Sequence, residues 1–241
     1  MKVVFTDLDG TLLDRDSYDY RPALPALERL RREGVPVVFV TSKTRAETEY
    51  WRARLDNSHP FVVENGGAAI IPAGSIAGAP ERIEFGDRYQ DLVTALERAS
   101  AASGCRVRGF HSMSAAEIAK LSGLPPDLAE LARRREYDEP FEILDPARAP
   151  ALLAAIEAQG KRWTRGGRFH HILGAHDKGT AVRALIALYR QAHPEVCSYG
   201  FGDAPNDAPF LAAVDQMSIV RSPKAWRDAV FRWVLGPPSH R

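Results

Sequence analysis

The sequence has few cysteines, no long apolar run and almost no net charge. Only two cysteines occur, Cys105 and Cys197, and neither has a second cysteine or a histidine at metal-site spacing, so we expect buried free thiols. No uninterrupted apolar run approaches the roughly 20 residues that a membrane-spanning helix needs. The formal net charge is +1, which predicts no general attraction to nucleic acid or to an anionic membrane.

Internal repeats and low-complexity tracts are also lacking, and the composition is that of a globular protein. Hydrophobic residues make up 45% and charged residues 26%, which excludes a disordered or fibrous chain. The 241 residues can form one large domain or two modest ones. Residues 1–6 contain neither a charged leader nor a small-residue cleavage site, so we expect a cytoplasmic protein.

Short apolar runs alternate with helix-length segments near both ends of the chain. This alternation is typical of a parallel sheet with crossover helices. The strands predicted in these two regions are residues 3–6, 35–40, 61–64, 196–202 and 217–220. The helices predicted between them are residues 24–33, 44–55, 178–191, 209–214 and 224–234.

The middle of the chain has a different organisation. Residues 71–86 are rich in proline, glycine and alanine, which predicts a connection between two bodies. After it come a helix with a capping box of Ser114 and Glu117, and a hairpin of residues 161–165 and 168–173 around Gly166-Gly167. The pattern therefore predicts an α/β fold, in which a Rossmann-like core with a parallel sheet carries a smaller inserted α+β domain.

The predicted boundaries follow from this change of pattern. The insertion is expected after the third core strand. Residues 1–82 form the first part of the core, residues 83–168 the inserted α+β domain, and residues 169–241 the second part of the core.

The strongest chemical signal is the pair of carboxylates in the segment Phe5-Thr6-Asp7-Leu8-Asp9-Gly10-Thr11. Because side chains alternate along an extended chain, Asp7 and Asp9 can face the same way as the first strand ends. Ligands bind beyond the carboxyl ends of the strands in open parallel sheets, so these acids lie where chemistry is expected. Two adjacent anions repel, and a bound cation or protonation of one of them lowers that cost.

Three other strand or helix ends supply matching groups. Thr41 and Ser42 follow the second strand and offer hydroxyl donors, whereas Asp203 and Asp207 follow a late strand and offer two more carboxylates. Lys178 opens a helix, where its ammonium group and the helix N-terminus both favour a phosphate. Together these groups predict an oxygen-rich magnesium site beside a cationic phosphate site.

Four segments resemble, in order, the motifs of the haloacid dehalogenase superfamily. They are FTDLDGTLLD, VTSK after the second strand, DKG at 177–179 and GDAPND at 202–207. Three more segments are similar to the mannosyl-3-phosphoglycerate phosphatase family, in the branch that inserts its cap after the third core strand. They are VENGG at 63–67, REYDE at 135–139 and WTRGGRFHH at 163–171. The resemblance covers about residues 3–234.

The resemblance implies a covalent mechanism on a phosphate monoester. Asp7 would attack phosphorus to give an aspartyl phosphate, and Asp9 would protonate the departing oxygen and then deprotonate the water. Thr41 and Lys178 would hold the transferring phosphoryl group. The catalytic residues expected are thus Asp7, Asp9, Thr41 and Lys178.

The resemblance also implies Mg²⁺ as the cofactor. Asp7, the backbone carbonyl of Asp9, and Asp203 would hold the ion, while Asp207 would orient the shell or a bound water. Other residues are expected to contact the substrate. They are Ser42, Lys43, Asn65, Arg135, Arg168 and Asn206.

Several of these assignments have a structural alternative. Asn65 either orients the active-site loops or satisfies the tight turn before Gly66. Arg135 closes a predicted helix with two other arginines, where cations interact favourably with the helix dipole. Arg165 and Arg168 flank the glycine turn and can reach a substrate carboxylate, and a binding role is favoured for Arg168. His170 and His171 are expected to support the hairpin or the seam between the domains rather than a metal, since magnesium prefers oxygen.

The expected partner is a small anionic sugar phosphate. The resemblance favours hydrolysis of mannosyl-3-phosphoglycerate to mannosylglycerate, with glucosyl-3-phosphoglycerate or another sugar phosphate as the alternative substrate. A phosphomutase, which returns the phosphoryl group to a sugar, is a further alternative. A non-enzymatic phospho-receiver module is disfavoured because it needs neither Asp9 nor so large an insertion. The oligomeric state is left open.

Overall fold

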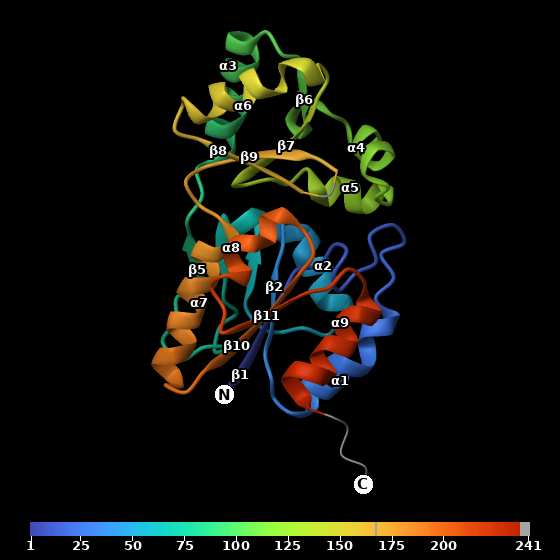
Figure 1. Cartoon of the computed structure of the whole chain (residues 1–241), viewed down its shortest axis with the longest axis vertical. Coiled ribbons are helices and arrows are strands. Elements are labelled where there is room, and N and C mark those ends of the chain that lie inside the picture. Colours follow the sequence, from blue (N-terminus) through green and yellow to red (C-terminus); the bar gives the residue numbers. More distant parts are fainter. Residues whose placement is uncertain (167, 237–241) are drawn as a thin grey trace.

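The computed structural model describes residues 1–166 and 168–236, which form two bodies stacked along the long axis (Figure 1). Both termini of the described chain belong to the larger body, the core. The smaller body, the cap, is built from the middle of the sequence. Among the described residues, no helix combines the length and the apolar character that crossing a bilayer requires.

The core contains a seven-stranded sheet with the order β11-β10-β1-β2-β3-β4-β5. The first five of these strands are parallel, whereas β4 and β5 are antiparallel additions at one edge. The chain runs outward in one direction through β2 and β3 and in the other through β10 and β11, so the order reverses beside β1. Ligands bind at such a switch point, outside the carboxyl ends of the strands. The strands are β1 Lys2–Thr6, β2 Val37–Val40, β3 Phe61–Val63, β4 Ala68–Ile70, β5 Arg82–Glu84, β10 Cys197–Gly202 and β11 Gln216–Ile219.

Helices cover both faces of the core sheet (Figure 1). Val4 of β1 packs into the cluster that includes Leu30 and Trp226, while Val3 and Phe5 pack into the cluster on the opposite face. This alternation within one strand explains why β1 is apolar throughout. One face carries α1 Leu24–Arg32, α2 Arg45–Arg54 and α9 Pro223–Val230, and the other carries α7 Lys178–Ala192 and α8 Ala208–Leu211.

The cap is an α+β unit with an antiparallel sheet in the order β6-β7-β9-β8. Leu96, Phe141 and Ile172 belong to its own apolar cluster, which joins the sheet to two helices. The strands are β6 Val107–Gly109, β7 Asp138–Ile143, β8 Arg162–Arg165 and β9 His170–Leu173, and the helices are α3 Tyr89–Ser103, α4 Ala115–Ser122, α5 Pro126–Ala132 and α6 Ala149–Glu157. The predicted capping box of Ser114 and Glu117 opens α4.

The predicted fold class is confirmed, but the strand pairing moves both boundaries of the insertion. β5 pairs with β4 in the core sheet, so the boundary after residue 82 cuts through a core strand. β9 pairs with β7 and β8, so the cap extends to residue 173 rather than 168. We place the cap at residues 85–173. Gly167, at the tip of the predicted hairpin, and residues 237–241 lie outside the described residues.

The boundary predicted after residue 82 was wrong because β5 is a short strand at the edge of the sheet. β5 has three residues, of which only Ile83 is apolar, so the sequence signal is short and pairing with β4 makes the segment a strand. The expectation for the cysteines holds for Cys105, which is a buried free thiol. Cys197 is also free, but it is only partly buried.

Candidate active site

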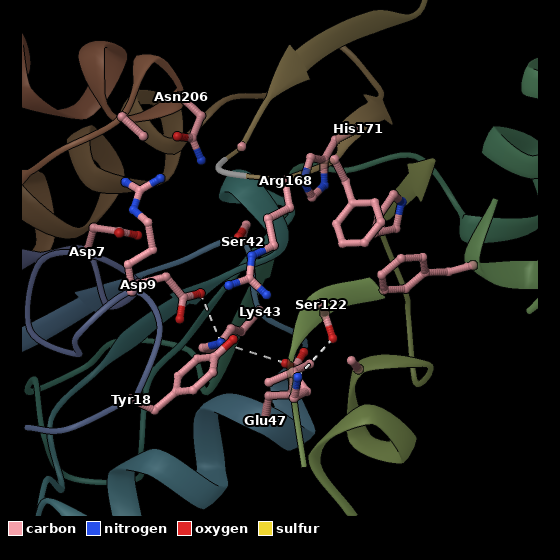
Figure 2. Close-up of a pocket in the computed structure, with 18 of the residues that line it drawn as sticks. Asp7, Asp9, Tyr18, Ser42, Lys43, Glu47, Ser122, Arg168, His171 and Asn206 are labelled. Atoms are coloured by element: carbon pink, nitrogen blue, oxygen red, sulfur yellow. Dashed lines mark hydrogen bonds and ion pairs between the residues drawn. The ribbon is translucent and has the colours of Figure 1, made fainter. Parts of the chain in front are cut away.

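A cavity of about 250 Å³ lies between the core and the cap (Figure 2). Its core side is formed by the loops that follow β1, β2 and β10, at the switch point of the sheet. Its cap side is formed by the hairpin of β8 and β9 and by residues near α5 and β6. The core side includes Asp7, Asp9, Ser42, Lys43, Asp203 and Asn206, and the cap side includes Phe110, Arg135, Arg168 and His171.

Asp7 lies directly after β1 and is 5% exposed. Lys178, the first residue of α7, places its Nζ 2.8 Å from Oδ1 of Asp7 and 2.6 Å from Oδ1 of Asp207. Burial and the charge of Asp207 raise the pKa of Asp7, while Lys178 opposes them. Burial alone would lower the pKa of Lys178, but Asp207 and Asp7 raise it, so the lysine is an ammonium ion. The buried cation therefore holds the two carboxylates in place.

Asp7, Asp203 and Asp207 form a candidate metal site, because one oxygen from each lies within 4.8 Å of the others. Burial raises the pKa of Asp203 as well as that of Asp7, although Arg15 lowers the first and Lys178 lowers both. Carboxylate oxygens are the donors that hard divalent cations prefer. The three residues therefore fit a divalent ion.

Asp207 also hydrogen-bonds to the loop that carries Asp203. Its Oδ2 accepts hydrogen bonds from the backbone N–H groups of Asp203 and Ala204, at 2.9 and 3.0 Å. A Cβ on Gly202 would lie 2.7 Å from the same oxygen, so glycine is needed where the loop passes this close. Asp207 thus fixes the loop that presents Asp203, as well as holding Lys178.

Asp9 lies on the same side of the cavity and is less buried than Asp7. Its Oδ2 pairs with Nζ of Lys43 at 2.9 Å (Figure 2). Its Oδ1 is buried, and no described group donates a hydrogen bond to it. The side chain as a whole is 36% exposed at the cavity, so a ligand reaches Asp9 through Oδ2 rather than through Oδ1.

Lys43, expected to contact the substrate, is 4% exposed and lines the cavity. The ring of Tyr18 lies 5.2 Å from its Nζ, and Glu47 lies at 3.8 Å. Burial alone would lower the pKa of Lys43, but Asp9 and Glu47 raise it. The lysine is thus a fixed cation that can contact either Asp9 or an anionic substrate.

Thr41 and Ser42 differ in position although they are adjacent. Thr41 is fully buried and does not line the cavity; its hydroxyl accepts a hydrogen bond from the backbone N–H of Lys43 at 3.1 Å. Ser42 lines the cavity, and its carbonyl accepts a hydrogen bond from Nη1 of Arg135 at 2.8 Å. The structure therefore brings Ser42 to the cavity surface and Thr41 beneath it.

Asn65 forms the tight turn after β3 and also contacts other loops of the site. Its φ is 56°, in the left-handed region that asparagine tolerates, so it does form the tight turn after β3. Its Nδ2 also donates to Oδ2 of Asp138 in the cap at 2.5 Å, and its Oδ1 accepts from Nδ2 of Asn206 at 2.9 Å. Asn65 therefore links the cap to the loop that carries Asp203.

Glu64 strengthens the same junction. Its φ is 47°, and its Oε2 accepts hydrogen bonds from the backbone N–H groups of Glu136, Tyr137 and Asp138 at 3.0, 2.8 and 3.0 Å. Burial raises the pKa of Glu64 to about 8, although Arg135 lowers it. The turn after β3 is thus a docking point for the strand β7 of the cap.

Two arginines extend from the cap. Arg135 is buried and also lies 3.3 Å from Oδ1 of Asp138, so it takes part in the seam between the bodies. Arg168 reaches into the cavity from the hairpin and pairs with Asp16 of the core at 3.3 Å (Figure 2). Arg165, its alternative, does not line the cavity.

Several cavity residues were not singled out from the sequence. Arg15 pairs with Asp203, Tyr18 covers Lys43, and Glu47 lies beside Lys43. Glu47 has a sequence signal, since it forms a capping box with Thr44 at the start of α2. Arg15 and Tyr18 follow the first motif closely but have no pattern of their own. Phe110 is distant in sequence from the core motifs, so only the fold brings it here.

Several known proteins resemble this chain in sequence. A family model described as haloacid dehalogenase-like hydrolase matches residues 4–92. A protein from Methanococcoides burtonii named glucosyl-3-phosphoglycerate/mannosyl-3-phosphoglycerate phosphatase is 42% identical over 236 residues, covering 94% of this chain and 87% of its own. A protein from Pyrococcus furiosus named mannosyl-3-phosphoglycerate phosphatase is 37% identical over 223 residues, covering 89% of each chain.

Solved structures share the fold at lower identity. The Thermoplasma acidophilum protein 0175 has a TM-score of 0.71 and 20% identity, covering 98% of this chain and 99% of its own. BT4131, described as a sugar phosphatase of HAD subclass IIB, has a TM-score of 0.67 and 15% identity, covering 97% and 99%. The arrangement of core and cap is therefore one that known structures also adopt.

Proposed function

Because the chain belongs to the haloacid dehalogenase-like hydrolases, in the mannosyl-3-phosphoglycerate phosphatase family, we propose that it removes the phosphate from mannosyl-3-phosphoglycerate. The products are phosphate and mannosylglycerate. The observation that supports this most directly is the convergence of Asp7, Lys178 and Asp203 beneath a cavity that a cap closes. We propose Mg²⁺ as the ion that these carboxylates hold, and the cytoplasm as the location.

The first step is attack by Asp7 on phosphorus. A bond forms between a carboxylate oxygen of Asp7 and phosphorus, and the bond from phosphorus to the glycerate oxygen breaks. Asp9 gives its proton to that departing oxygen. The position of Asp9 at the cavity surface, with its side chain 36% exposed, supports this assignment.

The second step is hydrolysis of the aspartyl phosphate. Asp9, now ionised, takes a proton from a water, and the water oxygen bonds to phosphorus as the bond to Asp7 breaks. Lys178 neutralises charge on the phosphoryl oxygens and stays hydrogen-bonded to Asp207 throughout. A bound Mg²⁺ would supply further charge neutralisation at the phosphoryl oxygens. The cap excludes bulk water while Asp7 carries the phosphoryl group.

Cations on the two sides of the cavity fit the rest of the substrate. The glycerate carboxylate is an anion, and Lys43 and Arg168 both lie at the cavity surface. A planar guanidinium binds a carboxylate in bidentate fashion, so we assign Arg168 to the carboxylate. Arg135, whose hydrogen bonds go to Ser42 and Asp138, is assigned to positioning these groups.

Phosphate release from purified protein tests the proposal. Mannosyl-3-phosphoglycerate and glucosyl-3-phosphoglycerate would be compared with and without Mg²⁺, and we expect magnesium-dependent turnover that is highest on the mannosyl ester. The glucosyl ester is the second candidate because the relative from Methanococcoides burtonii is named for both substrates. A large preference for glucose replaces the mannosyl assignment, and no release from either ester defeats it.

The phosphomutase alternative is separated by the fate of the phosphoryl group. After the aspartyl phosphate forms, a phosphatase passes it to water, whereas a mutase passes it to a sugar. Turnover in the presence of the product sugar should give free phosphate and no bisphosphorylated sugar. Membership of a hydrolase family and the size of the cap both count against a phospho-receiver module.

A further inference from the structure

A fully buried carboxylate lies at the seam between the two bodies. Asp138, the first residue of β7, is 0% exposed and accepts a hydrogen bond from Asn65 of the core. Nδ1 of His171, on the neighbouring strand β9, lies 2.9 and 3.0 Å from its two oxygens. Arg135 approaches the same carboxylate at 3.3 Å. Two of these three partners, His171 and Arg135, line the cavity.

The contact with Asp138 fixes which nitrogen of His171 carries hydrogen. Burial alone would raise the pKa of Asp138, but His171, Arg135 and Asn65 together lower it, so the carboxylate is ionised. An ionised carboxylate can only accept hydrogen bonds, so Nδ1 must donate. In the neutral ring, Nε2 then keeps its lone pair and is an acceptor.

The side chain of His171 lines the cavity, with its Nε2 beside Gly166. Within residues 1–166 and 168–236, no group forms a hydrogen bond with Nε2 of His171. A Cβ on Gly166 would lie 3.0 Å from Nε2, so the glycine leaves this nitrogen uncovered. His170 faces the other side of the strand, where its ring packs near Phe141 and Trp163. The two adjacent histidines therefore differ in access to the cavity.

The chemistry of the substrate identifies what such an acceptor can bind. In a glycosyl-3-phosphoglycerate, carbon 1 of the glycerate is the carboxylate, carbon 3 carries the phosphate, and the remaining oxygen, on carbon 2, carries the sugar. The glycerate part thus has no free hydroxyl, and its two anions have no hydrogen to donate near neutral pH. A lone-pair acceptor on the cap can therefore bond only to the sugar.

Building on the proposed function, we propose that His171 is a substrate-binding residue whose Nε2 accepts a hydrogen bond from a sugar hydroxyl. Asp138 is its positioning residue, because it sets the tautomer and the direction of the ring. This assigns different ligands to two residues of the cap hairpin: Arg168 takes the carboxylate and His171 the sugar. Carboxylates orient metal-binding histidines in a similar way in other proteins.

Kinetics on substrates with and without the sugar test the proposal. His171→Ala should lower kcat/KM for mannosyl-3-phosphoglycerate by about 10- to 100-fold, since the sugar hydroxyl loses its buried partner. Its effect on p-nitrophenyl phosphate, an ester with neither a sugar nor a free hydroxyl, should stay within about 2-fold. The matched control is His170→Ala, which should change neither rate by more than about 2-fold. Equal loss on both esters, or no loss on the mannosyl ester, overturns the assignment.

A spectroscopic readout tests the positioning role without any substrate. In the full chain with ¹⁵N-labelled histidine, at mildly alkaline pH, His171 should show the tautomer with hydrogen on Nδ1. Asp138→Asn should shift the ring toward the other tautomer, since the amide can donate to Nδ1. Hydrogen on Nε2 in the wild type overturns the proposal.

A failure of the proposed function and a failure of the role of His171 give different results. If the wild type releases phosphate from neither glycosyl ester, the proposed function fails whatever the tautomer is. If the wild type is active and His171→Ala keeps full kcat/KM on the mannosyl ester, the proposed function stands and the role of His171 is lost.

Discussion

The two sides of the cavity are built in different ways. On the core side, Asp7, Lys178 and Asp207 are at most 5% exposed and are bonded directly to one another. On the cap side, the side chain of Arg168 is 37% exposed and pairs with Asp16, which is 88% exposed. The first arrangement is fixed before any substrate arrives, whereas the second can rearrange around one.

The physical cost of burying charge explains this difference. Removing one member of a buried ion cluster leaves an uncompensated charge, which costs several kcal/mol, so the members of the core cluster are held together. A surface ion pair contributes only about 0–1 kcal/mol and can be exchanged for a substrate contact. The comparison suggests that the core determines the chemistry and the cap determines which ester is accepted.

Substitution of the nucleophile should have the largest effect and should spare binding. Asp7→Asn keeps the shape of the side chain but removes the attacking anion, so phosphate release should fall by at least about 10³-fold. The measurement is kcat for mannosyl-3-phosphoglycerate, with Asp56→Asn, an exposed and distant change, as the control. Substantial residual turnover would mean that another group attacks phosphorus.

Removal of the divalent ion should have the second largest effect on turnover. Chelation should lower kcat by at least about 10²-fold, and added Mg²⁺ should restore it, because charge neutralisation at the phosphoryl group is lost and regained. Asp203→Asn should raise the Mg²⁺ concentration needed for half-maximal activity. Activity that is unchanged by exhaustive chelation would contradict the metal assignment.

The pH dependence of ion binding follows from the same carboxylates. The pKa values of Asp7 and Asp203 are raised in the ion-free protein, so the ion must displace protons that these groups bind more tightly than usual. Stability of the ion-free protein should thus fall as pH rises above the unfolded pKa, and Mg²⁺ should restore it. The rise in melting temperature on adding Mg²⁺ should be larger at about pH 8 than at about pH 5. Asp203→Asn should reduce that rise.

Substitution of Arg168, on the cap side, should weaken substrate binding and leave the chemical step almost unchanged. Arg168→Ala should raise KM for mannosyl-3-phosphoglycerate by about 10-fold, since a bidentate contact with the carboxylate is lost, and should leave kcat within about 3-fold. Arg165→Ala is the matched control, because it removes the same charge from a residue that does not line the cavity. A fall in kcat as large as the rise in KM would show that the cap also takes part in the chemistry.

The junction between the two sides should show the smallest effect, and one that depends on pH. Burial raises the pKa of Glu64 from 4.5 to about 8, so the folded protein keeps a proton that the unfolded chain has released. Stability therefore decreases as pH rises from about 4.5 to about 8. Relative to Glu64→Gln, which does not titrate, the wild type should lose stability over that interval, as measured by urea denaturation. Glu130→Gln, an exposed change, should show no such trend.

Much of the core side could be predicted because its residues follow strands with a clear pattern. Asp7, Asp203 and Lys178 each come directly after or before a regular element, and parallel strands bring their ends to one edge of the sheet. Thr41 was placed at the right strand, but its burial beneath the cavity depends on the turn that leads to Lys43. The cap side was harder, because Arg168 was found only through a resemblance.

The sequence predicted a role for His171 at the hairpin or the seam, but not its contact with Asp138. Asp138 and His171 meet because β7 and β9 are neighbours in an antiparallel sheet, a pairing between segments more than 30 positions apart that no local pattern specifies. The boundary errors at β5 and β9 have the same origin. A segment of three or four residues at the edge of a sheet becomes a strand only because it pairs with the strand beside it.

By itself the sequence determined the class of fold and the order of the motifs, because alternation and strand ends are local properties of a chain. Tertiary structure decided which face of the cap closes the cavity, where the cap begins and ends, and which histidine of His170-His171 lines the cavity. These choices depend on strand register, since a shift of one residue turns every side chain to the opposite face.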